Sequence, residues 1–67
     1  MKLNELKEKT DDELRKLLSD LQGQMTKFMF DVSVGEEKNM RKGRGVRKAI
    51  AQLYTILRER HEQRVND

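Results

Sequence analysis

Apolar residues recur along most of this chain at the spacing of an amphipathic helix. In the first half they are separated by three, one, three, four, three, one and three positions: Leu14, Leu17, Leu18, Leu21, Met25, Phe28, Met29 and Val32. A period near 3.6 sustained over five turns predicts a helix that buries one stripe. A second stripe of the same period predicts a second long helix: Val46, Ala49, Ile50, Leu53, Ile56 and Leu57.

The residues that flank these stripes have the chemistry of helix ends. Thr10-Asp11-Asp12-Glu13 matches a capping box, in which the first and last side chains each satisfy a backbone N–H group. Gly35 is the expected left-handed terminator of the first helix, and Asn39 is the candidate cap of the second. Gly43 and Gly45 each cost about 1 kcal/mol relative to Ala in a helix, so we expect residues 40–45 to be irregular without a partner.

Two long helices joined by a short loop have one economical arrangement, in which they run antiparallel and bury their stripes on each other. We therefore predict the all-α class and a long αα-hairpin, with residues 1–67 forming a single domain. Leu3 and Leu6 predict a short N-terminal helical turn, too short to be stable alone. Three apolar residues fall beside the stripes, where a partner could cover them: Phe30, Val34 and Tyr54.

Size and composition restrict the function. A chain of 67 residues, 40% charged and 34% hydrophobic, has no room for a nucleotide-binding or barrel enzyme fold and builds only a marginal core, so we expect a partner to stabilise it. There is no Cys, and His61 is the only histidine, which excludes disulfides, zinc sites and catalytic triads within one chain. We therefore expect no catalytic residue, metal, cofactor or small-molecule substrate.

The longest uninterrupted apolar stretches are pairs and triplets, and the first ten residues are mostly polar. Neither a membrane span nor a secretory signal fits this pattern. We therefore expect a soluble cytoplasmic protein with no membrane partner.

Positive charge is concentrated in the second half of the chain. Residues 1–33 carry 6 Lys and Arg against 7 Asp and Glu, whereas residues 34–67 carry 9 against 5. The segment from Lys38 to Lys48 contains six cations and no acid. Neutralisation by phosphate is the usual source of binding free energy for such a block, so nucleic acid is the predicted partner. The alternative is a solvated helix face.

Two further features bear on this choice. Gly43 and Gly45 lie within the basic block and could let the backbone approach a phosphate, although a frayed helix start explains them equally well. With only two Phe, one Tyr and no Trp, the chain lacks a base-stacking platform, which favours recognition of backbone shape.

The second stripe also carries a family likeness. Val46-Arg47-Lys48-Ala49-Ile50-Ala51-Gln52-Leu53, followed by Thr55-Ile56-Leu57-Arg58-Glu59-Arg60, resembles the signature helix of the L twenty-nine family of large-subunit ribosomal proteins. The N-terminal turn, the helix start at Thr10, the Gly35 loop and Asn39 agree in order and spacing. The chain departs from the family pattern at three positions: Met29, Met40 and Tyr54.

This resemblance implies a non-enzymatic, ribosome-associated protein that binds large-subunit ribosomal RNA beside the polypeptide exit tunnel, next to a protein of the L twenty-three family. The basic block and the family-typical polar positions together predict the RNA contacts: Lys38, Asn39, Arg41, Lys42, Arg44, Arg47, Lys48, Gln52 and Thr55. The alternative from another class is a dimerising helical adaptor or small DNA-binding regulator. Salt-dependent affinity for RNA would separate the two.

Overall fold

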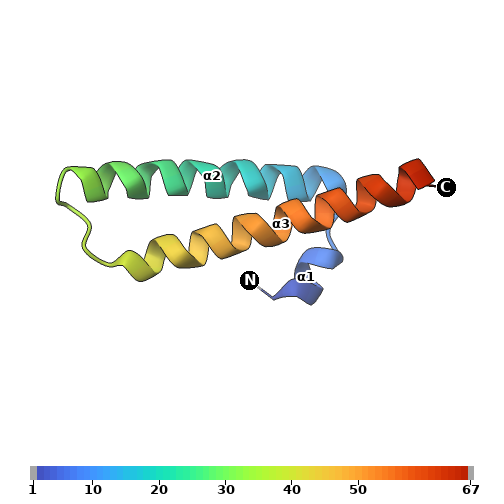
Figure 1. Cartoon of the computed structure of the whole chain (residues 1–67), viewed down its shortest axis with the longest axis horizontal. Coiled ribbons are helices and arrows are strands. Elements are labelled where there is room, and N and C mark those ends of the chain that lie inside the picture. Colours follow the sequence, from blue (N-terminus) through green and yellow to red (C-terminus); the bar gives the residue numbers. More distant parts are fainter. Residues whose placement is uncertain (1, 67) are drawn as a thin grey trace.

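The computed structural model describes residues 2–66, which contain three helices: α1 (Leu3–Lys7), α2 (Asp11–Ser33) and α3 (Met40–Asn66). In Figure 1, α2 and α3 run side by side in opposite directions and are joined at one end by residues 34–39. These residues form an elongated body of 49 × 18 × 16 Å. The prediction of an all-α chain built on an antiparallel helical hairpin is therefore confirmed.

The start of α2 is held by the predicted capping box. Thr10 Oγ1 accepts a hydrogen bond from the Glu13 backbone N–H at 3.2 Å, and Glu13 Oε1 accepts one from the Thr10 backbone N–H at 3.2 Å. These hydrogen bonds, chiefly the one from the Thr10 backbone, lower the pKa of the Glu13 carboxyl below its ordinary value of 4.5. Two backbone donors that α2 cannot satisfy internally are thus paired.

The end of α2 is the predicted left-handed turn. Gly35 has a φ of 78°, the conformation that glycine adopts without steric cost. Its N–H donates to the Val32 carbonyl at 3.1 Å, and the Glu36 N–H donates to the Asp31 carbonyl at 2.8 Å. This pair of bonds is a Schellman motif, which ends the helix and turns the chain toward α3.

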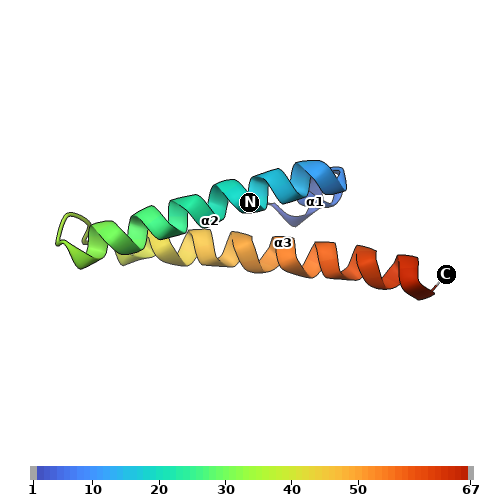
Figure 2. The same cartoon turned by 90° about the horizontal axis from the view of Figure 1, so that it is seen from above.

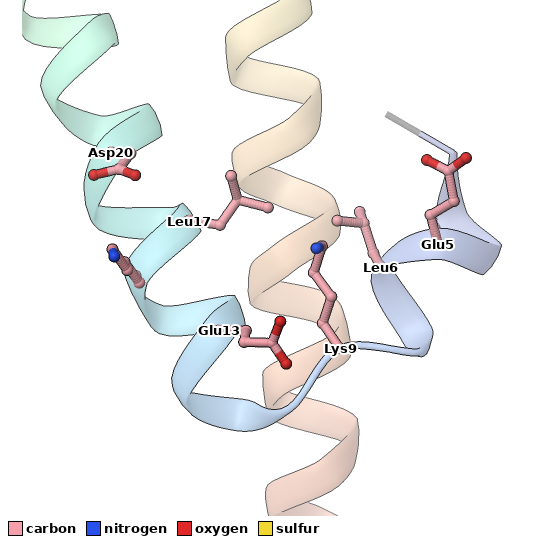
Figure 3. A pocket seen from close by; sticks show the side chains of 7 residues that line it. Glu5, Leu6, Lys9, Glu13, Leu17 and Asp20 are labelled. Carbon is pink, nitrogen blue, oxygen red and sulfur yellow. The ribbon is translucent and has the colours of Figure 1, made fainter.

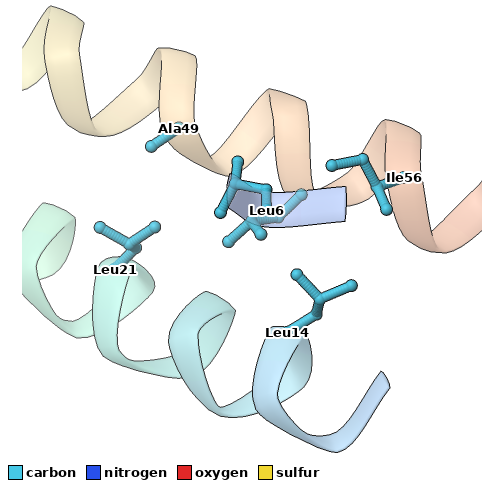
Figure 4. Close-up of a cluster of buried hydrophobic side chains, with 6 residues drawn as sticks. Leu6, Leu14, Leu21, Ala49 and Ile56 are labelled. Atoms are coloured by element: carbon cyan, nitrogen blue, oxygen red, sulfur yellow. The ribbon is translucent and has the colours of Figure 1, made fainter. Parts of the chain in front are cut away.

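The core lies between all three helices. Its buried members come from α1 (Leu6), α2 (Leu14 and Leu21) and α3 (Ala49, Leu53 and Ile56), and Figure 4 labels all of them except Leu53. Five other stripe residues are half-buried and pack against them: Leu17, Leu18, Val46, Ile50 and Leu57. Three more, Met25, Phe28 and Val32, are half-buried further along α2. Both predicted stripes are thus confirmed as the packing faces, with one exception.

That exception is Met29, which is 56% exposed. Phe28, the preceding residue, is half-buried and lies against α3. Because successive helical residues are rotated by about 100°, Met29 falls on the flank of α2 rather than between the helices. The assignment of Met29 to the buried stripe was therefore wrong.

The short helix α1 contributes more to the core than its length suggests. Leu6 is only 1% exposed, whereas Leu3 is 43% exposed. In Figure 1, α1 lies across α3 from α2, next to the second half of α3, whereas in Figure 2, turned by 90°, both lie on the same side of α3. Arg60 Nη2 also donates a hydrogen bond to the Lys7 carbonyl at 3.0 Å, at the end of α1. Five residues that cannot hold a helix alone are therefore ordered by tertiary contacts.

A charged clamp joins the C-terminal half of α3 to the start of α2. Arg60 Nη1 donates to Asp11 Oδ1 at 2.7 Å, and Arg64 Nη2 pairs with the other carboxylate oxygen. The hydrogen bond from Arg60, followed by the attraction of both guanidinium groups, holds the pKa of Asp11 below its ordinary value of 3.8, although partial burial opposes the shift. Sequence reasoning missed this contact because its partners are about fifty residues apart.

Three carboxyl groups have lowered pKa values, and two of them, Asp11 and Glu13, lie at the start of α2, where they make stability depend on pH. Both bind protons less tightly in the folded chain than in the unfolded chain. Their contribution is therefore complete above the ordinary values of 3.8 and 4.5 and is lost as the pH falls through the lower folded values. We expect a flat Tm from neutral pH down to about pH 5 and a progressive fall in more acidic buffer.

Thermal melts of the wild type and Asp11→Asn between neutral and acidic pH test this expectation. The variant should melt at a lower temperature than the wild type at pH 7, because an amide cannot pair with two guanidinium groups as a carboxylate does. It should also lose less Tm on acidification. An equal acid-induced fall in both proteins would show that the clamp does not titrate with folding.

Helix α3 begins at Met40 and continues without interruption through both glycines. The expectation that residues 40–45 are irregular was therefore wrong. Asn39 caps this helix as predicted, since its Oδ1 accepts a hydrogen bond from the Arg41 N–H at 3.1 Å. Packing against α2 supports the first turns and offsets the low helix propensity of glycine.

The two glycines of α3 have different surroundings. Gly43 is buried, and a Cβ atom there would lie 2.5 Å from Phe28 Cε1, so only glycine lets the ring rest on the helix backbone. Gly45 is exposed, and a Cβ atom there would have no neighbour within 4 Å. The hypothesis that Gly43 approaches a phosphate is therefore replaced by a packing role, while Gly45 retains open space beside it.

This difference predicts opposite outcomes for the same substitution. Gly45→Ala should stabilise the chain by about 0.5–1 kcal/mol through helix propensity alone. Gly43→Ala gains the same propensity but must displace the Phe28 ring, at an overpacking cost of about 1–3 kcal/mol. We expect the free energy of unfolding, measured in urea, to be lower for Gly43→Ala than for Gly45→Ala. Equal stabilisation by both substitutions would mean that the ring does not pack on Gly43.

Candidate nucleic-acid interface

The predicted RNA-contact residues do not all share one surface, but a subset lies in a row on the outer side of α3. Arg41, Arg44, Lys48 and Thr55, here called the outer row, are separated by three, four and seven positions and therefore share one helix face. All four are exposed. The buried residues Ala49 and Ile56 each follow a residue of the outer row by one position, so they are rotated by about 100° from it, into the core. The outer row thus points away from the rest of the molecule.

Four of the other predicted contacts lie beside this row. Gln52 is half-buried at one margin, and Arg47 is exposed at the other. Lys38 and Asn39 are exposed in the connection that leads into α3. Asn39 uses its side-chain oxygen as the helix cap, which leaves its amide NH₂ group as the part that can meet an external acceptor.

Lys42 is the predicted contact that the structure removes from this face. It follows Arg41 by one residue and is therefore rotated by about 100° around the helix, toward α2. Its Nζ forms a salt bridge with Glu37 Oε2 at 3.1 Å. The six cations between Lys38 and Lys48 have no acid among them in the sequence. In the folded chain, however, Lys42 is paired with Glu37, which lies just before this block.

Pairing with acids divides the cations of α3 into two groups. Lys42, Arg58, Arg60 and Arg64 each form a salt bridge with Asp or Glu. Among the side chains described in residues 2–65, no such pairing involves the remaining four: Arg41, Arg44, Arg47 and Lys48. The uncompensated positive charge of α3 is therefore confined to the exposed side of its N-terminal half.

Polar groups next to these cations suit a sugar–phosphate surface. Thr55 Oγ1 donates to the Ala51 carbonyl at 3.0 Å, so the hydroxyl is held at the surface with its lone pairs directed outward. Ala51 is exposed on the same face, and the open space beside Gly45 adds another point of close approach. Arg supplies bidentate geometry and Lys a point charge, and both are suited to phosphate oxygens.

Apolar side chains remain exposed on other sides of the hairpin. Phe30 is 63%, Tyr54 53% and Val34 50% exposed, as predicted from their positions beside the stripes. Tyr54 also bridges the two long helices, because its hydroxyl accepts a hydrogen bond from Gln22 Nε2 at 2.8 Å. The three departures from the family pattern, Met29, Met40 and Tyr54, are thus all more than half exposed.

Two surface clefts have rims of mixed charge. The larger, about 460 Å³, lies between α1 and α2, where Leu6 and Leu17 form its apolar part. Its rim combines acids and bases: Glu5, Lys9, Glu13 and Asp20, which are labelled in Figure 3, and Lys16. A second cleft, between α2 and α3, has a similarly mixed rim. Within residues 2–66, no cluster of three metal-ligating side chains occurs, and no helix is long and apolar enough to cross a bilayer.

Comparison with known proteins decides the family. The profile of the family described as Ribosomal L29 protein matches residues 4–60, which include all three helices' packing contacts and the entire outer row. The chain belongs to the ribosomal L29 family. Proteins of this family are structural, non-enzymatic components of the large ribosomal subunit, so the alternatives of an adaptor or a DNA-binding regulator are not supported.

Individual relatives agree with this assignment along nearly the whole chain. The large ribosomal subunit protein uL29 of Alkaliphilus metalliredigens is 45% identical over 65 residues, covering 97% of each chain. That of Thermoanaerobacter sp. is 43% identical over 60 residues, or 90% of this chain and 87% of the relative. That of Mycolicibacterium smegmatis is 43% identical over 56 residues, which are 84% of this chain and 73% of the relative. Family membership confirms the predicted location on cytoplasmic ribosomes.

Proposed function

We propose that this L29-family protein binds large-subunit ribosomal RNA through the exposed side of the N-terminal half of α3, beside the polypeptide exit tunnel. The observation that carries this proposal is the gathering of uncompensated cations on one face. Arg41, Arg44 and Lys48 on the outer row, and Arg47 at its margin, are exposed and have no acidic partner among the side chains described in residues 2–65, whereas the other four cations of α3 are paired with acids within the chain.

The mechanism is electrostatic and depends on shape. Each cation that meets a phosphate releases condensed counterions from the RNA, which supplies a favourable and salt-dependent free energy. A straight helix carries these cations at fixed spacing, so it selects RNA whose phosphates lie at matching distances. Thr55 and the margin residue Gln52 contribute hydrogen bonds to sugar or phosphate oxygens. In this arrangement the domain of residues 1–67 acts as one module that braces folded RNA.

A neighbouring protein of the L twenty-three family is the proposed second partner. Phe30 and Val34 are at least half exposed near the loop end of α2, and together with Met29 they leave apolar surface that RNA phosphates would not cover. Such side chains are typical of contacts with another protein. RNA on the outer row and protein on these apolar side chains would together supply the stabilisation that a 67-residue chain lacks.

Co-sedimentation with large ribosomal subunits through a high-salt wash tests the proposal. We expect the wild type to remain with the subunit and Arg44→Gln/Lys48→Gln to be released at lower salt. The matched control is Lys16→Gln/Lys27→Gln, which removes the same charge from exposed positions on α2 and should be retained like the wild type. Equal retention of both double variants, or equal loss, would contradict an interface on α3.

A further inference from the structure

Glu37 is an acid at the edge of the basic surface, and its position is unusual for a residue near bound phosphate. Its side chain is only 19% exposed, and its two carboxylate oxygens serve different partners. Oε1 accepts a hydrogen bond from the Asn39 backbone N–H at 2.9 Å, and Oε2 accepts one from Lys42 Nζ at 3.1 Å. One carboxylate thus ties the connecting loop to the first turn of α3.

These contacts converge on the residues that begin α3. Asn39, whose N–H is bound by Glu37, is the residue whose side chain caps the helix at Arg41. Lys42, held by the same carboxylate, precedes Gly43, whose backbone lies against the Phe28 ring. The direction in which Arg41 and Arg44 leave the helix therefore depends on a short chain of contacts that starts at Glu37.

The charge balance supports the same conclusion. The Glu37 carboxylate has a pKa below its ordinary value of 4.5, mainly because of the Asn39 N–H and then because of Lys42, so it is ionised at neutral pH. If Lys42 left it to contact a phosphate, an unpaired carboxylate would remain next to the RNA. Two anions at close range repel each other, so this repulsion would offset part of what a new phosphate contact gains.

We propose that Glu37 and Lys42 are positioning residues, which fix the start of α3 for RNA binding without contacting the RNA themselves. This inference rests on the proposed function and divides the basic block by role. The outer-row cations neutralise phosphates, whereas Lys42 neutralises Glu37. A block that looks uniform in sequence therefore contributes fewer phosphate contacts than its six cations suggest.

The test measures how tightly two variants bind one RNA, a full-length transcript of the large-subunit ribosomal RNA of Alkaliphilus metalliredigens. One variant keeps the net charge of the wild type, and the other lowers it. Glu37→Gln/Lys42→Gln removes the ion pair without changing the net charge. We expect it to leave the slope of log affinity against log salt unchanged, with affinity reduced by a factor of about two to ten at every salt concentration because binding must then order the helix start. Arg44→Gln, the control, should lower the slope by about 0.7–0.9.

Amide hydrogen exchange in the protein without RNA gives an independent readout. The Asn39 and Arg41 amides should exchange faster in Glu37→Gln/Lys42→Gln than in the wild type, while the Leu17 and Leu21 amides in α2 should be unchanged. Unchanged exchange at Asn39 and Arg41 would overturn the positioning role. So would a fall in slope as large as that of Arg44→Gln, which would make Lys42 a phosphate contact. If Arg44→Gln leaves the slope unchanged, the proposed function fails instead, and this inference fails with it.

Discussion

Leu14→Ala is expected to abolish the cooperative unfolding of the hairpin or to lower its Tm severely. Leu14 is fully buried near the start of α2, in the part of the core where all three helices meet. Truncating a buried leucine costs about 2–5 kcal/mol, because the lost contacts are replaced by a cavity. Small domains often have little more stability than this. Circular dichroism at 222 nm during thermal and urea unfolding measures the effect.

Met29→Ala provides the matched control for this substitution. It removes a side chain of similar volume from the same helix, but from a position that is 56% exposed. Its effect should stay within about 0.5 kcal/mol, as for other surface changes. A Leu14→Ala protein that melts like the wild type would contradict a core shared by α1, α2 and α3.

Arg41→Ala/Arg44→Ala/Lys48→Ala is expected to produce the largest loss of RNA affinity. Each lost phosphate contact removes about 0.7–0.9 from the slope of log affinity against log salt, so the triple variant should lose about 2–3 in total. The affinity deficit should therefore be greatest at low salt and should narrow as salt rises. Filter binding or fluorescence anisotropy over a range of potassium concentrations measures both quantities.

The control for charge is Lys2→Ala/Lys16→Ala/Lys27→Ala, which removes three exposed cations from outside α3. It changes the net charge equally, so a purely non-specific attraction to RNA would weaken by the same amount in both triple variants. We expect only a small reduction in slope for the control. Matching slopes for the two triple variants would contradict recognition by the outer row.

Local features of the fold followed from the sequence because neighbouring residues determine them. The capping box at Thr10 and the turn at Gly35 depend on side chains within a few positions, and both are present as predicted. The helical period of the two stripes likewise identified the packing faces, including the burial of Leu14 and Leu53. These features need no knowledge of how the helices cross.

Features that depend on the crossing of the helices were not predictable in this way. The clamp of Arg60 on Asp11 and the contact of Phe28 with Gly43 join residues that are distant in sequence, and nothing in either segment alone specifies the partner. Leu6 is likewise buried because α2 and α3 together surround it, although its own helix has five residues. The continuity of α3 through its glycines has the same tertiary origin.

The candidate interface was predictable as a region and not residue by residue. The density of cations between Lys38 and Lys48 led to the candidate region, which the structure shows to be the connection before α3 and the largely exposed start of that helix. The salt bridge that withdraws Lys42 could have been suspected from Glu37, which lies five positions earlier, outside the block. Only the folded chain shows that the loop returns this acid to the helix rather than to solvent.

The most direct test of RNA binding by the outer face of α3 is site-specific photocrosslinking within assembled large subunits. A photoreactive side chain is placed at Ala51, which is exposed between the cations and Thr55, and in a second protein at Gly23, which is exposed on α2 with open space around it. Neither position removes a charge or a buried contact. If the outer face of α3 lies on RNA, position 51 crosslinks to large-subunit ribosomal RNA in far higher yield than position 23. Crosslinks to RNA from position 23, with none from position 51, would contradict RNA binding by this face.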